Sequence, residues 1–420
     1  MKMKRFTAIF SIFIVLSVNT GAFAAVPAAD TMPTIYAQSA ISIDLSTNEI
    51  ICEKNIDNST YPASTTKLMT ALLLAESKTQ GDMLTYTEDA KKQPEYSLNT
   101  NLFPISVGDK FSAKDAMLGL LLYSGNDVAY MIADNVSGNA ENFKNKMNEE
   151  VQKLGLKNTH FVTPNGLHDK DHYTTAYDLS VIAKTAYANQ WVQEAMGTKK
   201  ADISTASGIK MTVENRNKLL GSNGCIGGKT GYTSEAGKCL VAVYERDGRK
   251  ILGIVMKSVY DANDTFVFND MEKVIDWSYA QKPTALYKSN TVIKTESLKY
   301  KPLVFFGPVK TIDVPVISKQ DVTYYDNKVN KTELKENYDF TPLSTAALNG
   351  GKSIGTLKVN IRDSVKTYEL YSSLPKLAIF KANFLLYLGT LVGFIGAVLA
   401  LIFGIKKIID MKRKNRTYYY

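Results

Sequence analysis

The chain has 420 residues, of which 45% are hydrophobic and 22% charged, and its formal net charge is +9. This composition is that of a globular protein and excludes a disordered or fibrous chain, and the length favours two folded domains. The first 24 residues carry +3 and the segment after Lys381 carries +5, so 9 − 3 − 5 leaves about +1 for residues 25–381. Because the cations gather at the ends, the basic balance does not indicate a nucleic-acid partner.

The N-terminal segment has the pattern of a secretory signal peptide. A basic start is followed by an apolar run from Phe6 to Val18 and by small residues that end at Ala24. This order predicts a signal peptide over residues 1–24 that is cut after Ala24, so the protein is exported. A retained N-terminal anchor is the alternative, and the shortness of the apolar run disfavours it.

The following segments alternate between strand and helix patterns. Residues 40–54 alternate apolar and polar side chains around a turn at Ser46–Asn48, which predicts a β-hairpin. Apolar residues at helical spacing predict helices after Ser64, over Ala113–Val136, over Asp178–Tyr187 and over Asn269–Tyr279. Strands are predicted from Lys229 onward, with a hairpin turn at Asp247–Gly248.

The composition changes near Gln281–Pro283. From residue 284 to residue 374 the chain shows strand-like alternation and turn residues but no convincing helix. This pattern predicts a small all-β domain over residues 284–374.

A long apolar segment follows the predicted β domain. Phe384 to Ile405 is 22 residues without a charge, long enough to cross a hydrocarbon layer of roughly 30 Å, which predicts a transmembrane helix over residues 384–405. Six cations and one aspartate come directly after it, which predicts a basic cytoplasmic tail over residues 406–420. The chain is therefore expected to be anchored to the cell membrane with its folded part on the extracytoplasmic side.

Cysteine usage excludes two classes of small protein. Cys52, Cys225 and Cys239 are the only three cysteines, and no C-x-x-C pair occurs, so neither a disulfide scaffold nor a zinc knuckle is indicated. Whether Cys225 and Cys239 are bonded stays open.

The stretch "PASTTKLMTALLLAE" has two interpretations. Ser64 and the threonines after it are good N-cap residues, and a lysine in the first turn is ordinary. Residues three apart also share one face of a helix, so the amine of Lys67 can reach the hydroxyl of Ser64 and, if its pKa is lowered, take its proton. A helix N-terminus would add N–H groups where an oxyanion forms. Taken alone, the S-x-x-K pattern is weak evidence.

Two further short motifs favour the catalytic interpretation of Ser64 and Lys67. Ser124–Asn126 is a polar break inside an apolar helical run, and Lys229–Gly231 begins a predicted strand. In this order the three motifs, S-x-x-K, S-x-N and K-T-G, resemble those of the penicillin-recognising serine enzymes. The chain is most similar to the serine-type D-Ala-D-Ala carboxypeptidases, the low-molecular-mass penicillin-binding proteins, over roughly residues 35–280. The surrounding words that fit are "YPASTTKLMTALL", "YSGNDVAYMIAD", "FVTPNGLHD", "YTTAYDLSVIA" and "GGKTGYTSEAGKCLVA".

The resemblance implies a fold and an activity. The fold is of the α/β class (α+β type), a penicillin-recognising serine transpeptidase/β-lactamase-like domain over residues 30–280 whose mostly antiparallel sheet is flanked by helices. The activity is D,D-carboxypeptidase: removal of the terminal D-alanine from peptidoglycan stem peptides through an acyl-enzyme, with β-lactam antibiotics as covalent inhibitors. No cofactor and no metal is implied, and the oligomeric state stays open.

Residue roles also follow from the resemblance. Ser64 would be the acylated nucleophile and Lys67 its general base, while Ser124 would relay a proton to the leaving group. Asn126 would orient Lys67 and bind the substrate's peptide group. The residues implied in substrate binding are Lys229, which supplies positive charge, Thr230 for the terminal carboxylate, Gly231, which lets the peptide lie against the strand, and Tyr232, whose N–H would complete an oxyanion hole with that of Ser64.

The chain departs from the family at two places. Family members often carry an arginine shortly before the last helix of the catalytic domain, and residues 261–273, "DANDTFVFNDMEK", contain none. The residue that completes carboxylate recognition is therefore open. The family more usually ends in an amphipathic surface helix, whereas this chain has a full hydrophobic span.

Other functions are disfavoured by specific absences from the sequence. A Ser-His-Asp triad needs a histidine, and the three histidines all lie between His160 and His172. The G-x-S-x-G match "GKSIG" at residues 351–355 precedes a predicted strand, whereas the nucleophile of such a triad stands before a helix. "HDKDH" at residues 168–172 is interpreted as a polar loop rather than a metal site. "GSNGCIGGKT" fails as a phosphate loop because Asn223 stands where glycine is needed. A β-lactamase, a transpeptidase or endopeptidase of the same fold, and a non-catalytic wall-binding module remain as alternatives.

Overall fold

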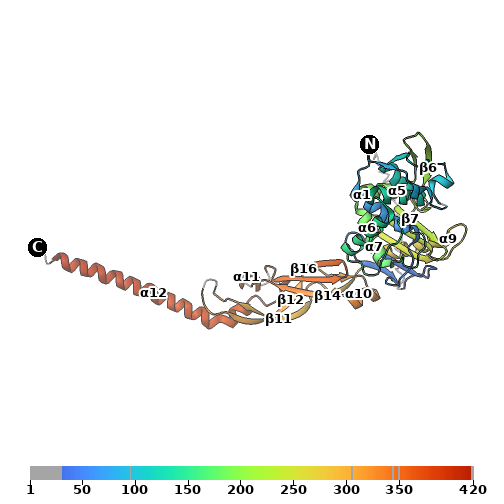
Figure 1. Cartoon of the computed structure of the whole chain (residues 1–420). Coiled ribbons are helices and arrows are strands. Elements are labelled where there is room, and N and C mark those ends of the chain that lie inside the picture. Colours follow the sequence, from blue (N-terminus) through green and yellow to red (C-terminus); the bar gives the residue numbers. More distant parts are fainter. Residues whose placement is uncertain (1–30, 95, 304–305, 343–344, 349–350, 418–420) are drawn as a thin grey trace, which may run out of the picture.

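A computed structural model describes residues 31–94, 96–303, 306–342, 345–348 and 351–417. The predicted signal peptide, residues 1–24, lies outside the described residues. Figure 1 shows three parts that follow one another along an elongated molecule: a rounded part at the N-terminal side, a narrow part made mostly of strands, and one long helix.

A five-stranded antiparallel sheet lies at the centre of the rounded part, with the strand order β2-β1-β9-β8-β7. Its strands are β1 (Ser39–Asp44), β2 (Ile50–Lys54), β7 (Cys225–Thr233), β8 (Gly237–Arg246) and β9 (Arg249–Ser258). The predicted hairpin over residues 40–54 is confirmed as β1 and β2. The strands predicted from Lys229 begin four residues earlier, at Cys225.

Side chains alternate between the two faces of this sheet and feed two hydrophobic cores. On one face Ala40, Leu240 and Val255 pack with the helix α9 (Thr265–Ala280). The helix lies close because β9 has Gly253, where an added Cβ would be 2.7 Å from the sulfur of Met271. The predicted helix over Asn269–Tyr279 is thus confirmed and is longer at its start.

The other face of the sheet is covered by helices that build the larger core. The helices are α1 (Lys67–Ser77), α4 (Ala113–Leu118), α5 (Asn126–Ser137), α6 (Ala140–Lys153), α7 (Ala176–Ala188) and α8 (Gln190–Gly197). Shorter elements complete this part: η1 (Ala63–Thr66), α2 (Glu88–Lys91), α3 (Leu98–Asn101), η2 (Gly119–Tyr123), β3 (Met83–Thr85), β4 (Lys110–Ser112), β5 (Lys200–Ser204) and β6 (Lys210–Glu214). The mostly antiparallel sheet with flanking helices is the predicted fold class.

The helix predicted over Ala113–Val136 is interrupted where the polar break stands. α4 runs into η2, a turn of π-helix, and the chain then passes through Ser124 at φ 74° before α5 begins. A serine in the left-handed region is strained, and such residues concentrate at functional sites. The chain therefore changes direction at Ser124.

The narrow part contains a second five-stranded antiparallel sheet with its own core. The strand order is β11 (Val292–Tyr300), β12 (Lys310–Ser318), β16 (Ser364–Ser372), β15 (Gly355–Ile361) and β14 (Lys335–Phe340), and a small pair joins β10 (Thr284–Tyr287) to β13 (Val322–Tyr324). Two short helices, α10 (Lys328–Glu333) and α11 (Thr345–Leu348), were not predicted. α10 has the sequence KVNKTE, too short and too poor in helix formers to give a periodic pattern, and it depends on the cap made by Asn327.

One end of this second sheet is attached to the rounded part. Arg362, in the turn between β15 and β16, donates to both oxygens of Asp57 at 2.9 and 2.7 Å and to those of Glu333 at 2.7 Å. Lys366 donates to Glu49 at 2.9 Å. These contacts fix the β15–β16 hairpin against the first sheet's hairpin, so the opposite end of the second sheet points away from it.

The helix α12 (Ala378–Thr417) leaves from that opposite end. Its segment Ala378–Lys414 is long and apolar enough to cross a membrane, and the apolar 18-residue window within it is not buried by other elements. The predicted span, residues 384–405, lies within it, but the helix begins six residues earlier. The first turns of α12 pack on the second sheet, where Ile379 is 3% exposed and Asn383 is 2% exposed.

Candidate active site

Ser64 lies in the short 3-10 turn η1, directly before α1. Its side chain caps no helix N–H, so the N-cap interpretation of the sequence is wrong. The turn is held between two glycines. A Cβ on Gly231 of β7 would approach Pro62 O at 3.0 Å and Ser64 N at 3.1 Å, and a Cβ on Gly166 would lie 2.0 Å from Ala63 O. These close backbone approaches fix the position of the serine.

Lys67 is the first residue of α1 and is completely buried. Its Nζ lies 2.9 Å from Ser64 Oγ, 2.9 Å from Asn126 Oδ1 and 2.8 Å from the carbonyl oxygen of Asn165. Burial lowers the pKa of this amine to about 7, helped by the positive charge of Arg216 and opposed by Asp127. A substantial fraction of Lys67 is therefore neutral near pH 7.

The three partners of Lys67 define where its lone pair points when it is neutral. A neutral amine has two N–H donors and one acceptor site. The amide oxygen of Asn126 and the carbonyl oxygen of Asn165 can only accept, so they take the two N–H groups. The lone pair is then left for the hydroxyl hydrogen of Ser64. This arrangement is that of a base aimed at its nucleophile.

Ser124 stands beside a second buried lysine. Lys229 is 1% exposed, and its Nζ donates to Ser124 Oγ at 2.8 Å and to the carbonyl oxygen of Thr230 at 2.8 Å. Burial lowers its pKa well below the ordinary lysine value, with further contributions from Lys67 and Arg216. The hydroxyl of Ser124 thus accepts a hydrogen bond from a buried lysine whose neutral form is favoured by burial.

The first residues of α5 also hold the loop that carries Tyr96, which lies across from β7. The backbone N–H of Asn126 donates to the carbonyl oxygen of Tyr96 at 2.9 Å. The carboxylate of the neighbouring Asp127 accepts from the N–H groups of Leu98 and Asn99, both at 3.0 Å, and from Tyr86 at 3.0 Å. One helix turn therefore places Asn126 in the site and ties down the loop that carries Tyr96.

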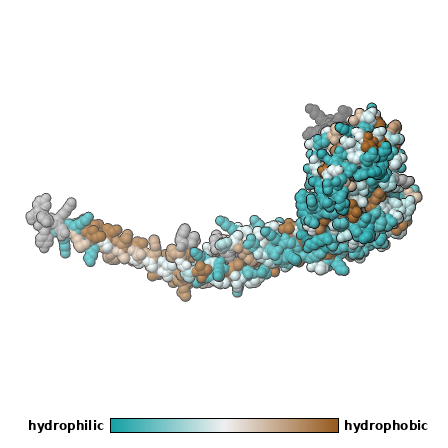
Figure 2. All heavy atoms as spheres, in the orientation of Figure 1, coloured by the Kyte–Doolittle hydropathy of each residue, from teal (hydrophilic) through white to brown (hydrophobic). Residues whose placement is uncertain are grey.

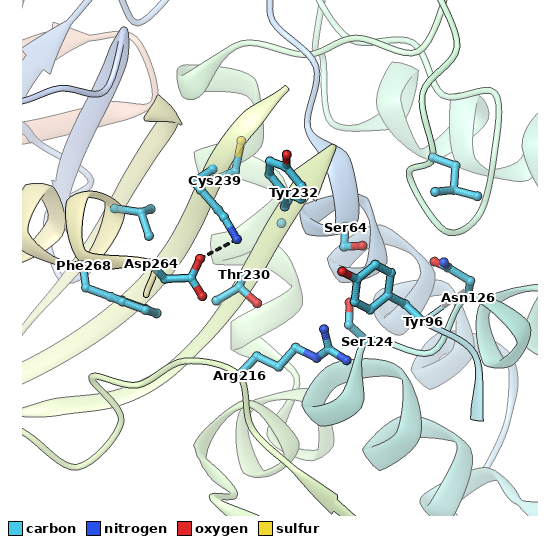
Figure 3. Close-up of a pocket in the computed structure, with 14 residues that line it drawn as sticks. Ser64, Tyr96, Ser124, Asn126, Arg216, Thr230, Tyr232, Cys239, Asp264 and Phe268 are labelled. Carbon is cyan, nitrogen blue, oxygen red and sulfur yellow. Dashed lines mark ion pairs between the residues drawn. The ribbon is translucent and has the colours of Figure 1, made fainter. Parts of the chain in front are cut away.

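These side chains surround one pocket, which Figure 3 shows between β7 and the loop at Tyr96. All the residues that the sequence analysis singled out are brought together there. The predicted residues that line the pocket are Ser64, Ser124, Asn126, Thr230, Gly231 and Tyr232. Lys67 and Lys229 lie buried behind the two serines and reach them through their amino groups.

Arg216 and Tyr96 are pocket residues that the sequence analysis missed. The guanidinium carbon of Arg216 lies 5.0 Å from the ring centre of Tyr96 and 4.8 Å from that of Tyr123. Within the described part of the chain no carboxylate forms an ion pair with this arginine, whereas the other pocket cation, Lys238, is paired with Asp264. Neither residue belongs to a motif with fixed spacing, so no pattern in the sequence indicated them.

His172 and the three cysteines are buried inside the fold. His172 is buried, and its Nδ1 accepts from the N–H groups of Val162 and Thr163 at 3.1 and 3.2 Å, so its Nε2 carries the proton and donates to Thr66 Oγ1 at 2.9 Å. Burial lowers its pKa to about 3, which keeps it neutral. Cys225 and Cys239, whose bonding the sequence left open, are both free and buried, as is Cys52.

Comparisons with known proteins show the family of the chain. A family model described as D-alanyl-D-alanine carboxypeptidase, peptidase S11, matches residues 26–259. The D-alanyl-D-alanine carboxypeptidase DacF of Bacillus subtilis is 28% identical over 324 residues, which are 76% of this chain and 80% of DacF. DacC of Escherichia coli is 30% identical over 334 residues, 77% of this chain and 80% of DacC.

Solved structures give the same result for the fold. The crystal structure of a Streptomyces DD-transpeptidase is 30% identical and superposes with a TM-score of 0.55, covering 60% of this chain and all of that one. The family match spans more than half of the sequence. The chain therefore belongs to the D-alanyl-D-alanine carboxypeptidase family of serine peptidases, S11.

Proposed function

We propose that this protein is a serine D,D-carboxypeptidase that removes the terminal D-alanine from peptidoglycan stem peptides. The observation that carries the proposal is the contact between the buried amine of Lys67 and the hydroxyl of Ser64, 2.9 Å apart, in a pocket open to a peptide. The family membership and the names of the relatives supply the substrate class.

Acylation uses the residues in the following order. Ser64 Oγ attacks the carbonyl carbon of the penultimate D-alanine while its proton moves to the lone pair of Lys67. The carbonyl oxygen becomes an oxyanion, held by the N–H groups of Ser64 and Tyr232. Ser124, held by Lys229, passes a proton to the leaving nitrogen and recovers one from the protonated Lys67, so the peptide bond breaks, D-alanine departs and Lys67 is neutral again. An ester on Ser64 remains.

Deacylation completes the cycle. A water molecule gives a proton to Lys67 and attacks the ester carbon, which releases the shortened peptide and returns the hydrogen to Ser64 Oγ. An amine acceptor in place of water would make the reaction a transpeptidation. β-Lactam antibiotics would form the same ester, and their slow hydrolysis would make them covalent inhibitors.

Substrate recognition would use β7 and two side chains. The peptide lies extended along β7, where Gly231 has no side chain to exclude it. Its terminal carboxylate is bound by the hydroxyl of Thr230 and by Arg216, the pocket cation that has no carboxylate partner in the described chain. Arg216 thereby fills the role left open by the missing arginine in residues 261–273.

The location of the enzyme follows from its ends. We propose that residues 1–24 direct export and are removed, that residues 30–280 form the catalytic domain, and that residues 284–374 form a spacer domain. Residues 384–405 would cross the membrane, with residues 406–420 in the cytoplasm. The pocket then faces the cell wall from the outer surface of the membrane.

The nucleophile is tested by replacing Ser64. We expect Ser64→Ala to lose D-alanine release from a pentapeptide stem and covalent labelling by fluorescent penicillin, while Thr65→Ser, which keeps a hydroxyl one residue away, retains both. Liberated D-alanine and the labelled band are the readouts. Labelling of Ser64→Ala at the native rate would refute the assignment. A label lost within seconds would indicate a β-lactamase, and peptide transfer without free acid would indicate a transpeptidase.

The carboxylate role is tested by replacing Arg216. Loss of a hydrogen bond to a charged group costs about 1.5–3 kcal/mol, so we expect kcat/KM of Arg216→Gln to fall by roughly 10- to 100-fold. Because the guanidinium also lowers the pKa of Lys67, the pH profile should move to higher pH. Lys238→Gln, which removes the cation paired with Asp264, is the matched control. Equal kinetics for Arg216→Gln and the native enzyme would contradict the role.

A substitution of Gly166 tests whether this glycine positions the turn that contains Ser64. Gly166→Ala and Gly138→Ala introduce a side chain at similar backbone angles, φ +80° and +83°, but only the first would collide with Ala63 O. Both variants should lose about 1–2 kcal/mol of unfolding free energy from the left-handed backbone, or more for Gly166→Ala. Only Gly166→Ala should also lose penicillin acylation. Unchanged acylation in folded Gly166→Ala would show that this contact does not position Ser64.

A further inference from the structure

The end of the second sheet that faces α12 carries an unusual combination of apolar and basic side chains. β11 ends there at Tyr300 and β12 begins there at Lys310, and α12 contacts this end of the sheet at Tyr300 and Pro302. Exposed apolar side chains at this end include Phe306 at 67%, Val309 at 56% and Phe380 at 48%. Figure 2 shows that the apolar surface of α12 reaches the end of the sheet from which the helix leaves.

Direct contacts fix this end of the sheet to the helix. The side-chain amide of Asn383 donates to the hydroxyl of Tyr300 at 2.6 Å in a buried position. One turn later the hydroxyl of Tyr387 donates to the carbonyl oxygen of Pro302 at 3.4 Å. Ile379 is part of the core of the second sheet. The helix therefore continues from the sheet without a free linker between them.

The position of the membrane boundary can be counted along α12. The cations that follow the apolar run begin at Lys406, and about 20 residues of helix cross a hydrocarbon layer of ~30 Å. Counting 20 residues back from 406 gives residue 386, next to Tyr387. The contact between Tyr387 and Pro302 thus lies at the level where the helix leaves the hydrocarbon. A tyrosine such as Tyr387 is typical of this interface.

The charged residues nearest this end are lysines, and the first carboxylates along the two strands are those of Glu296 and Asp313. Residues 298–312 and 373–405 contain no aspartate or glutamate. Their lysines are Lys299, Lys301, Lys310, Lys376 and Lys381. Among the described residues none of these five forms an ion pair. Basic residues beside a membrane surface attract anionic lipid headgroups.

We infer that this end of the second sheet is itself a membrane-binding surface, with Phe306, Val309 and Phe380 in the interfacial layer and the lysines on anionic headgroups. The inference depends on the proposed anchoring by α12. Two attachments, the helix and the β11–β12 end, would prevent the sheet from tilting freely. The distance of the catalytic pocket from the membrane would then be set by the length of the second sheet.

The test uses the full chain in nanodiscs that contain phosphatidylglycerol, with one NBD fluorophore per protein. Val309→Cys and Val365→Cys provide a matched pair, because the two valines are 56% and 57% exposed at opposite ends of the same sheet. The native cysteines are buried, so labelling is selective. We expect lipids with a doxyl group high in the acyl chain to quench the label at 309 and to leave the label at 365 unchanged.

Two further measurements distinguish a failure of the proposed α12 anchoring from a failure of the inference itself. A label at Leu399→Cys, within the predicted span, must be quenched by a deep doxyl group. If it is not, the proposed anchoring by α12 fails. If the label at 399 is quenched and the label at 309 is not, the inference alone is overturned. Exchange of phosphatidylglycerol for phosphatidylcholine should reduce quenching at 309, and undiminished quenching would overturn the role of the lysines.

Discussion

The catalytic pocket depends on two lysine amines that are withdrawn from water and still face the reacting groups. Lys67 and Lys229 lie behind Ser64 and Ser124, and each is connected to its serine by one hydrogen bond. For Lys67, burial favours the neutral amine, which is what a base requires, and the oxygens of Asn126 and Asn165 orient it. The remaining features of the site hold this pair in place.

This arrangement has a cost in stability. The folded-state pKa of Lys67 is lowered to about 7, so between that pH and the ordinary lysine value the unfolded chain binds more protons than the folded one. The contribution of this group to the stability of the fold therefore increases as pH rises through that window and is least favourable below pH 7. A lysine on the protein surface would avoid the cost but could not act as a base.

The sequence was informative where chemistry demands fixed residues at fixed spacing. The three short motifs indicated both serines of the pocket and the two buried lysines behind them, but not Lys238. The periodic segments indicated α1, the α4–α5 segment, α7, α9 and the first hairpin, but not α6 or α8. What escaped prediction depends on tertiary contacts. Arg216 becomes a pocket residue only because the segment after β6 passes Tyr96 and Tyr123. Ser64 lies in a 3-10 turn that Gly231 and Gly166 approach closely, and its side chain caps no helix. The helix α10 was missed because a side-chain cap and its contacts, rather than its propensity, stabilise it.

The central claim is that a neutral Lys67 activates Ser64. It is tested most directly by the rate of Ser64 acylation by benzylpenicillin, followed by rapid mixing as a function of pH. The account predicts that the rate constant rises with pH through a midpoint of about 7 and then reaches a plateau. A rate that is independent of pH, or one that rises only near the ordinary lysine pKa of about 10.4, would contradict it.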